Sequence, residues 1–159
     1  MERPTRCISC RTLSGELQPP GGIIYNHVHW AVFLRSQPLL VPGQGFIVLR
    51  RHCEDIAKLT AEEAVTLGEV MRRVALTYMQ VLAPERVHFG LDTEDVRHGH
   101  LHVLPRTRRL PAGNIPITLL AAWYGVLQRL SLREAYSDDD VARVTNLLRE
   151  SSSQLERHE

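Results

Sequence analysis

The sequence has no excess of charge of either sign, and lysine is almost absent from it. Its 159 residues include 19 lysines and arginines and 18 aspartates and glutamates, which gives a formal net charge of +1 with neutral histidines. Lys58 is the only lysine. A chain with balanced charge produces no global field that attracts a polyanion. We therefore expect no bulk binding to nucleic acid.

Long hydrophobic runs are also missing. The longest nearly apolar run spans 115–127 and contains Pro116, Thr118 and Gly125. It falls short of the ~20 apolar residues that a membrane-spanning helix needs. The first residues are polar and charged, without the apolar core of a signal peptide. These absences predict a cytoplasmic protein with no membrane segment.

Cysteine is scarce, with three residues at Cys7, Cys10 and Cys53. So few cysteines give no disulfide framework, and a reducing compartment disfavours disulfides in any case. Cys7 and Cys10 have Cys-x-x-Cys spacing. This pair is a candidate for metal binding or for redox chemistry.

The strand and turn signals predict one sheet-containing domain. The hydrophobic share of 43% and the charged share of 23% suit one compact domain, for which about 150 residues is usual. Apolar alternation between Gly and Pro turns predicts strands at 23–25, 29–34, 45–49, 87–91 and 98–104, the last two paired antiparallel.

Two helices are predicted from their start signals. Thr60 and Glu63 form a capping box, and apolar residues then recur at three- and four-residue steps until Pro84, so we expect a helix over 61–82. The acidic triplet after Ser137 suits a helix N-terminus and predicts a helix over 138–151. Strands, then a helix, then strands, then helices indicate the α+β class.

Three of the eight histidines, His98, His100 and His102, occupy alternate positions of the last predicted strand. Alternation places them on one face, opposite Leu101 and Val103, with about 6.6–7 Å between successive histidines. That spacing suits a phosphate group or a metal ion. Two other interpretations stay open at this point: polar residues on a solvated strand face, or ligands of a catalytic zinc.

The run from His98 to Arg106, His-Gly-His-Leu-His-Val-Leu-Pro-Arg, resembles the signature of the histidine triad family of nucleotide hydrolases and transferases. The similarity extends upstream to Pro-Leu-Leu-Val-Pro-Gly at 38–43, Arg-His at 51–52, Leu-Thr-x-x-Glu at 59–63 and Glu-Arg-Val at 85–87. The resemblance implies a five-stranded antiparallel sheet with a long helix and C-terminal helices. It also implies a homodimer that joins two such sheets.

The resemblance implies a catalytic role for two of the histidines. His100, the middle one, is the expected nucleophile toward an α-phosphorus, and His102 is the expected donor to the α-phosphate oxygens. The implied substrate is a small nucleotide derivative, such as a dinucleoside polyphosphate, an AMP ester or a phosphoramidate. Its binding site is expected to include Arg35, Gln44 and Asp92 together with His102.

Some members of the family carry a structural zinc, and by resemblance its ligands here are Cys7, Cys10, His52 and His98. Two thiolates and two imidazoles satisfy tetrahedral zinc and leave no open coordination position. The metal is therefore expected to attach the N-terminal arm to the sheet. We expect a domain over 1–110 that includes this arm, and a C-terminal helical extension over 111–159 packed on the same domain.

The sequence departs from the family pattern at several positions. Gly99 replaces a bulky aliphatic residue, Gln44 replaces the usual histidine after Pro-Gly, and 35–36 replace an Asn or Asp of the ribose site. The acidic stretch 92–97 lacks the Gly-Gln pair that helps to hold phosphate. These departures support an alternative, a catalytically degenerate family member that binds nucleotides or a protein partner without turnover.

Overall fold

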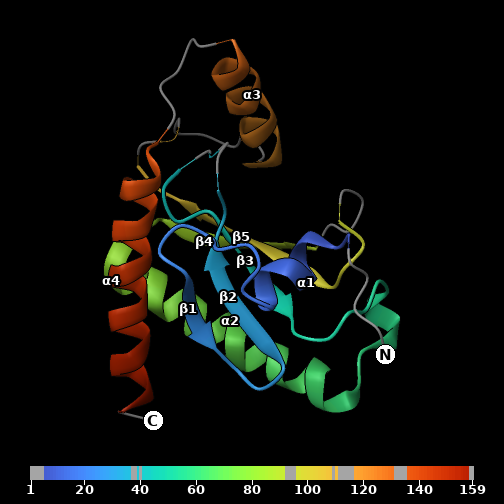
Figure 1. Ribbon diagram of the computed structural model, residues 1–159. Helices are drawn as coiled ribbons and strands as arrows, with labels where there is room; N and C mark the ends of the chain where they lie inside the picture. Colours follow the sequence, from blue (N-terminus) through green and yellow to red (C-terminus); the bar gives the residue numbers. More distant parts are fainter. Residues whose placement is uncertain are drawn as a thin grey trace.

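Five antiparallel strands and four α-helices make up the described part of the chain, as the α+β prediction requires (Figure 1). The computed structural model describes residues 6–36, 39, 41–91, 96–108, 110, 117–130 and 136–157. The strands are β1 (Ile23–Asn26), β2 (Trp30–Leu34), β3 (Gly45–Leu49), β4 (Arg86–Leu91) and β5 (His100–Arg106). The helices are α1 (Ile8–Leu13), the 3₁₀ turn η1 (Ile56–Lys58), α2 (Ala61–Leu82), α3 (Ile117–Arg129) and α4 (Asp138–Glu156).

The strands form one sheet in the order β1-β2-β3-β5-β4, and every neighbouring pair is antiparallel. The predicted antiparallel pairing of the last two strands is therefore confirmed. β1 and β4 are the edges of the sheet. In Figure 1, α2 passes behind the strands, α4 stands along the β1 side, and α3 projects at the top.

Helix α2 has the predicted bounds because its start is fixed by side-chain hydrogen bonds. The Thr60 hydroxyl accepts from the backbone N–H of Glu63, and the Glu63 carboxylate accepts from the backbone N–H of Thr60. The helix ends at Leu82, and its C-cap, Ala83, has φ 43° immediately before Pro84. The indole N–H of Trp30 donates to the carbonyl oxygen of Glu63 and ties the helix start to β2.

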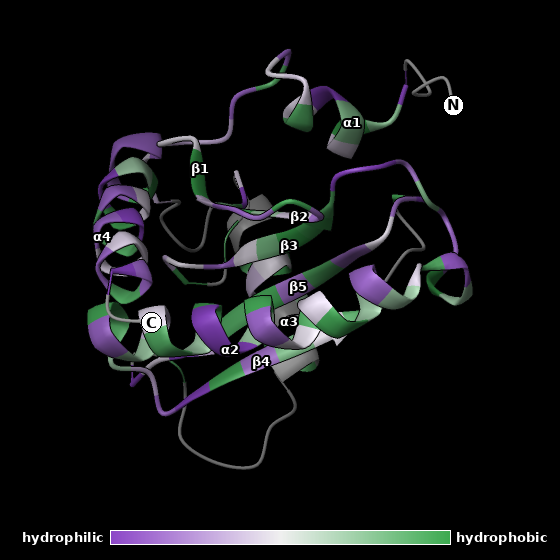
Figure 2. Ribbon diagram, turned by 90° about the horizontal axis from the view of Figure 1, so that it is seen from below, coloured by the Kyte–Doolittle hydropathy of each residue, from purple (hydrophilic) through white to green (hydrophobic). Residues whose placement is uncertain are grey.

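The hydrophobic core lies between the sheet and the pair α2 and α4. From the strands it takes Val32, Leu34, Ile47, Leu49, Leu101 and Val103, and from the helices Val70, Val74, Tyr78, Val141 and Leu148. Figure 2 shows this pattern as hydrophobic colour on β2 and β3 and alternating colour along α4. Among the described residues, no helix combines the length and the apolar character that a bilayer span requires.

Two helices differ from the sequence prediction. Helix α1 follows Cys7 and was not predicted, because its N-cap makes no side-chain hydrogen bond that would identify it. Helix α4 continues five residues beyond the predicted end, to Glu156. Helix α3 lies within the C-terminal segment for which helices were expected. The division into 1–110 and 111–159 stays a prediction.

Strand β5 begins at His100 rather than at His98, and it continues through Pro105. The backbone N–H of Leu49 donates to the carbonyl of Gly99. The backbone N–H and C=O groups of the odd-numbered residues from Gly99 onward therefore point toward β3. β3 starts at Gly45, which pairs with Val103. Pro105 therefore lies beyond the end of β3, where its missing N–H breaks no ladder bond.

Candidate functional site

His100 and His102 project from β5 on the face opposite α2. They alternate with Leu101 and Val103, which belong to the core beneath the helices. The two imidazole centroids lie 5.1 Å apart. His100 is buried and His102 is half-buried. The predicted sharing of one face therefore holds for these two histidines, whereas His98 precedes the strand.

The imidazole of His100 is held in one orientation by its own backbone neighbourhood. Its Nδ1 lies 2.6 Å from the carbonyl oxygen of His98. A carbonyl can only accept, so Nδ1 carries the proton and the lone pair of the neutral ring is on Nε2. This is the tautomer that a nitrogen nucleophile needs.

Phe46 packs against both imidazoles. Phe46 and His102 are directly opposite in the β3–β5 ladder, and they form a non-hydrogen-bonded pair, in which side chains approach closely. The Phe46 ring meets the rings of His100 and His102 edge-on, with centroids 5.6 and 5.0 Å apart. Phe33 packs on the far side of Phe46 at 6.0 Å. Aromatic contacts thus restrict both imidazole rings.

His98 lies outside the strand and turns toward the end of β3. Its Nε2 donates to the carbonyl oxygen of Leu49 at 2.6 Å, which leaves the lone pair on Nδ1. Burial lowers the pKa of His98 and favours the neutral ring. The next residue, Gly99, is bound through its backbone N–H to the carbonyl of Cys53. A Cβ at Gly99 would make ordinary contacts with Leu49 and Cys53, so the glycine leaves little empty space.

Cys7, Cys10, His52 and His98 converge from three parts of the chain, as the resemblance implied. One ligand atom from each lies within 4.8 Å of the other three. The Nδ1 atom of His98 lies 3.3 Å from Cys7 Sγ, 3.6 Å from Cys10 Sγ and 3.3 Å from His52 Nδ1. Cys10 Sγ lies 3.5 Å from His52 Nδ1.

These distances match the edges of a zinc tetrahedron. Zinc bonds of about 2.3 Å to sulfur and about 2.0–2.1 Å to nitrogen place sulfur about 3.5 Å from nitrogen, and the two nitrogens about 3.3 Å apart. Both histidines also have the outer partners that zinc-binding histidines use. His98 bonds to the Leu49 carbonyl, and His52 Nε2 lies 3.4 Å from the Glu54 carboxylate. The residues present therefore fit zinc.

The loop that carries His52 is anchored to the start of α2. Arg51 makes two hydrogen bonds to the Glu63 carboxylate, at 2.6 and 2.7 Å, and a third to the carbonyl of Lys58. The guanidinium of Arg51 lowers the pKa of the buried Glu63 carboxyl to about 2. This pair fixes the backbone immediately before the expected metal ligand.

The expected substrate-binding residues are only partly described. The backbone N–H of Arg35 donates to the carbonyl of Gln44 at 2.9 Å. These two residues therefore lie side by side, immediately after β2 and immediately before β3. By alternation from Phe33 and Phe46, both belong to the histidine face. Asp92 lies outside the described residues.

His88 belongs to the same face and was not singled out by the sequence analysis. His88 lies in β4 opposite Leu104 of β5, two residues from Gly90, which is the β4 partner of His102. Its Nε2 is buried and has no hydrogen-bond partner within the described part of the chain, and burial lowers its pKa. Its alternation with Val87 and Phe89 was the available signal, but a single strand histidine does not indicate a function.

Known proteins provide an independent comparison. No protein-family model and no curated protein matches the sequence. A zinc-bound histidine triad family protein from Mycobacterium smegmatis is 22% identical, with 97% of this chain and 98% of that chain covered and a TM-score of 0.68. A hypothetical histidine triad nucleotide-binding protein from Sulfolobus tokodaii is 16% identical, with 95% of each chain covered and a TM-score of 0.69.

A third solved structure, of a protein from Bartonella henselae described as Hit-like and involved in cell-cycle regulation, is 11% identical. The match covers 94% of this chain and 99% of that chain, with a TM-score of 0.68. All three similarities extend beyond residue 106 into the C-terminal helices. The chain therefore has the fold of the histidine triad proteins and a two-cysteine, two-histidine cluster that could hold a metal ion.

Proposed function

We propose that the chain is a histidine triad nucleotide hydrolase or nucleotidyl transferase that cleaves an α-phosphate linkage through a covalent intermediate on His100. The observation that carries this proposal is the hydrogen bond from His100 Nδ1 to the His98 carbonyl, which leaves Nε2 as the nucleophile. The fold similarity to a histidine triad nucleotide-binding protein supports a nucleotide as the substrate.

The reaction would have two steps. In the first, Nε2 of His100 forms a bond to the α-phosphorus, and the bond to the leaving group breaks with its electron pair on that group. In the second, water attacks the phosphorus and the phosphorus–nitrogen bond breaks. The mononucleotide leaves and Nε2 recovers its lone pair. The proton that the attacking water loses neutralises the leaving-group anion formed in the first step. His102, one imidazole away, would donate to the α-phosphate oxygens in both transition states.

The proposed zinc has a structural role. Cys7, Cys10, His52 and His98 would fill all four positions, so zinc would supply a crosslink between the N-terminal arm and the sheet. The similarity to a zinc-bound protein of this fold supports the metal assignment. Thiolate ligands persist in a reducing compartment, which supports the cytoplasmic location expected from the sequence.

The same proposal includes a homodimer formed through β4 and α2. β4 is an edge strand, and the backbone groups of its odd-numbered residues, Val87, Phe89 and Leu91, point away from β5. Leu91 is 48% exposed at this edge. Pairing two such edges across a two-fold axis would protect both of them.

A panel of α-linked nucleotides tests the function. Dinucleoside polyphosphates, AMP esters and AMP phosphoramidates are incubated with the zinc-loaded chain, and mononucleotide release is measured. The proposal predicts release from at least one class, and no release by His100→Ala. Nucleotide binding without release by the native chain would favour the degenerate alternative, and release that persists in His100→Ala would contradict the proposed nucleophile.

A further inference from the structure

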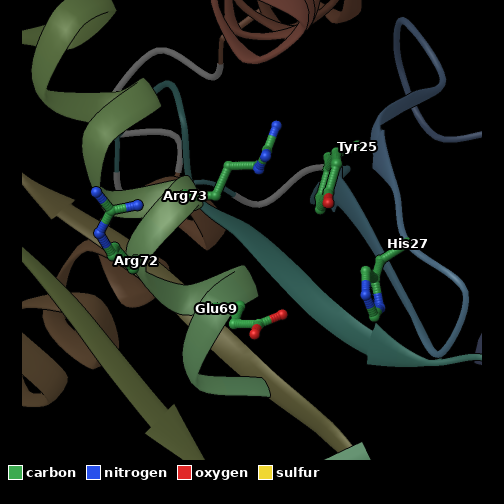
Figure 3. A pocket seen from close by; sticks show the side chains of 5 residues that line it. All are labelled: Tyr25, His27, Glu69, Arg72 and Arg73. Atoms are coloured by element: carbon green, nitrogen blue, oxygen red, sulfur yellow. The ribbon is translucent and has the colours of Figure 1, made fainter. Parts of the chain in front are cut away.

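A cavity lies on the helix side of the sheet, away from the histidine face. It has a volume of about 390 Å³ and is lined by Tyr25 and His27 from the β1 end and by Glu69, Arg72 and Arg73 from α2 (Figure 3). Tyr25 pairs with Val32, whose side chain lies in the core beneath the helices. The catalytic candidates face the opposite side, so this cavity is separate from the site described above.

Arg73 is held at the wall of the cavity by contacts to other elements. Its guanidinium lies over the Tyr25 ring, 4.9 Å from the centroid, and 3.6 Å from the Glu156 carboxylate at the end of α4. Its side chain is 13% exposed. Glu69, four residues earlier on the helix, is at the spacing that favours an ion pair with Arg73. The contacts of Arg73 to Tyr25 and Glu156 replace that pair.

Glu69 consequently presents its carboxylate to the cavity. Figure 3 shows it directed from α2 into the space between the helix and His27. Within the described part of the chain, this carboxylate makes no hydrogen bond or ion pair. The wall of the cavity therefore carries an exposed carboxylate that makes no hydrogen bond or ion pair among the described residues, together with Arg72 and Arg73 of the same helix.

His27 supplies a neutral donor on the opposite wall. Its Nδ1 accepts a hydrogen bond from the backbone N–H of His29 at 3.2 Å, so the proton of the neutral ring is on Nε2. Burial lowers the pKa of His27, which keeps the ring neutral near pH 7. Nε2 has no hydrogen-bond partner among the described residues.

We propose that this cavity binds a small zwitterion of the amino-acid type, with its ammonium group on Glu69 and its acidic group on His27 and Arg73. A simple anion would bring its charge close to Glu69, and a simple cation would bring its charge close to Arg72 and Arg73. A molecule that carries both charges meets all of these groups favourably. The Tyr25 ring gives its carbon chain an apolar surface, and the volume is at the lower end of that of small-molecule sites.

Three probes of matched size separate the possible ligand classes. The zinc-loaded full chain is titrated with γ-aminobutyrate, butyrate or butylammonium, and backbone amide shifts are followed by NMR; free α-amino acids extend the zwitterion class. We expect saturable shifts confined to 25–27 and 69–73 with at least one zwitterion. Butyrate and butylammonium each lack one charged group of the zwitterion, and each is expected to bind about tenfold more weakly. The variants Glu69→Gln and Arg73→Gln each lack one charged group of the protein, and each is expected to bind the zwitterion about tenfold more weakly.

The control variant is Glu150→Gln, an exposed carboxylate on α4 outside the cavity, which should leave the affinity unchanged. A native-like amide spectrum establishes that each variant is folded. Butyrate binding as tightly as every zwitterion, unchanged affinity in folded Glu69→Gln, or no saturable shift with any zwitterion would each overturn the proposal. Because the His100→Ala variant retains this cavity, its zwitterion binding should equal that of the native chain, whatever the triad does.

Discussion

The carbonyl oxygen of His98 lies 2.6 Å from Nδ1 of His100, so a candidate metal ligand orients the candidate nucleophile directly. The side chain of His98 is fixed in turn by the Leu49 carbonyl and by its place among two cysteines and His52. Any shift of the metal cluster would therefore move the backbone group that determines the His100 tautomer. The candidate metal site and the proposed nucleophile therefore both depend on this one residue.

The first prediction concerns the metal cluster. Cys10→Ser removes one of four ligands, and the purified variant should contain less zinc than the native chain, which should carry one zinc per protomer. Its Tm should fall by about 10 °C, because metal binding contributes to folding and each kcal/mol shifts Tm by about 2–4 °C at this chain length. Elemental analysis and calorimetry measure both quantities.

Cys53→Ser is the matched control for this prediction. Cys53 is likewise buried and in no disulfide, but its Sγ donates to the Asp55 carbonyl and it is not a member of the metal cluster. The variant should keep its zinc. Absence of zinc from native protein prepared without chelators would contradict the assignment.

The ion pair of Arg51 and Glu63 predicts how stability changes with acid. The folded chain lowers the pKa of Glu63 from 4.5 to about 2, so its contribution is present above pH 4.5 and is lost as the pH falls toward 2. Arg51 is 37% exposed and solvent screens the pair, which limits the effect to about 1–2 kcal/mol. Compared with Glu63→Gln, the native chain should have a higher free energy of unfolding at pH 7 and a much smaller advantage at pH 3.

Chemical denaturation of both proteins at the two pH values, with zinc removed from both, measures this difference. The glutamine can still accept the capping hydrogen bond from Thr60, so the comparison isolates the charge. An advantage that is equal at pH 7 and pH 3 would show that the ion pair does not cause it.

The proposed dimer predicts a mass of twice 18.1 kDa in sedimentation. Leu91→Lys places a charge at the β4 edge and should weaken association about tenfold or more, since like charges would meet across the two-fold axis. Leu147→Lys on α4 is the matched control, because Leu147 is also 48% exposed but lies away from this edge. A native mass near 18 kDa at micromolar concentration would exclude the dimer.

The sequence predicts best where one local signal determines the structure. The capping box of Thr60 and Glu63 predicted the start of α2 and Pro84 predicted its end, and the alternating apolar residues predicted the five strands. It failed at His98, because the position of that residue depends on the distant Leu49 carbonyl and on the cysteines. The start of β5 thus follows from tertiary contacts that periodicity does not contain.

Other features could not be predicted because they involve distant segments. Phe46 contacts both candidate catalytic imidazoles only through the register of β3 and β5. The cavity lined by Tyr25 and Arg73 forms where Arg73 packs on Tyr25 and Glu156, and these three residues come from separate elements. The metal ligands were named through the resemblance, and the convergence of those four side chains agrees with it.

His102 should contribute less to the rate than His100. Replacing it by alanine removes one donor to the α-phosphate oxygens and should lower kcat about 10²–10³-fold, the usual effect of losing one preorganised donor. His29→Ala is the control, because His29 lies beside Glu62 on α2 rather than on β5. Steady-state rates on the best substrate of the nucleotide panel measure both variants, and an unchanged rate in His102→Ala would contradict its role.

The covalent step on His100 is tested most directly by rapid quench. The native chain is mixed with a nucleotide labelled at the α-phosphate, the reaction is stopped in alkali to preserve a phosphorus–nitrogen bond, and the label on the protein is located by peptide mapping. The account predicts label on the peptide that contains His100 in the native chain and no label in His100→Ala. Full turnover by His100→Ala, or label that persists on that variant, would contradict it.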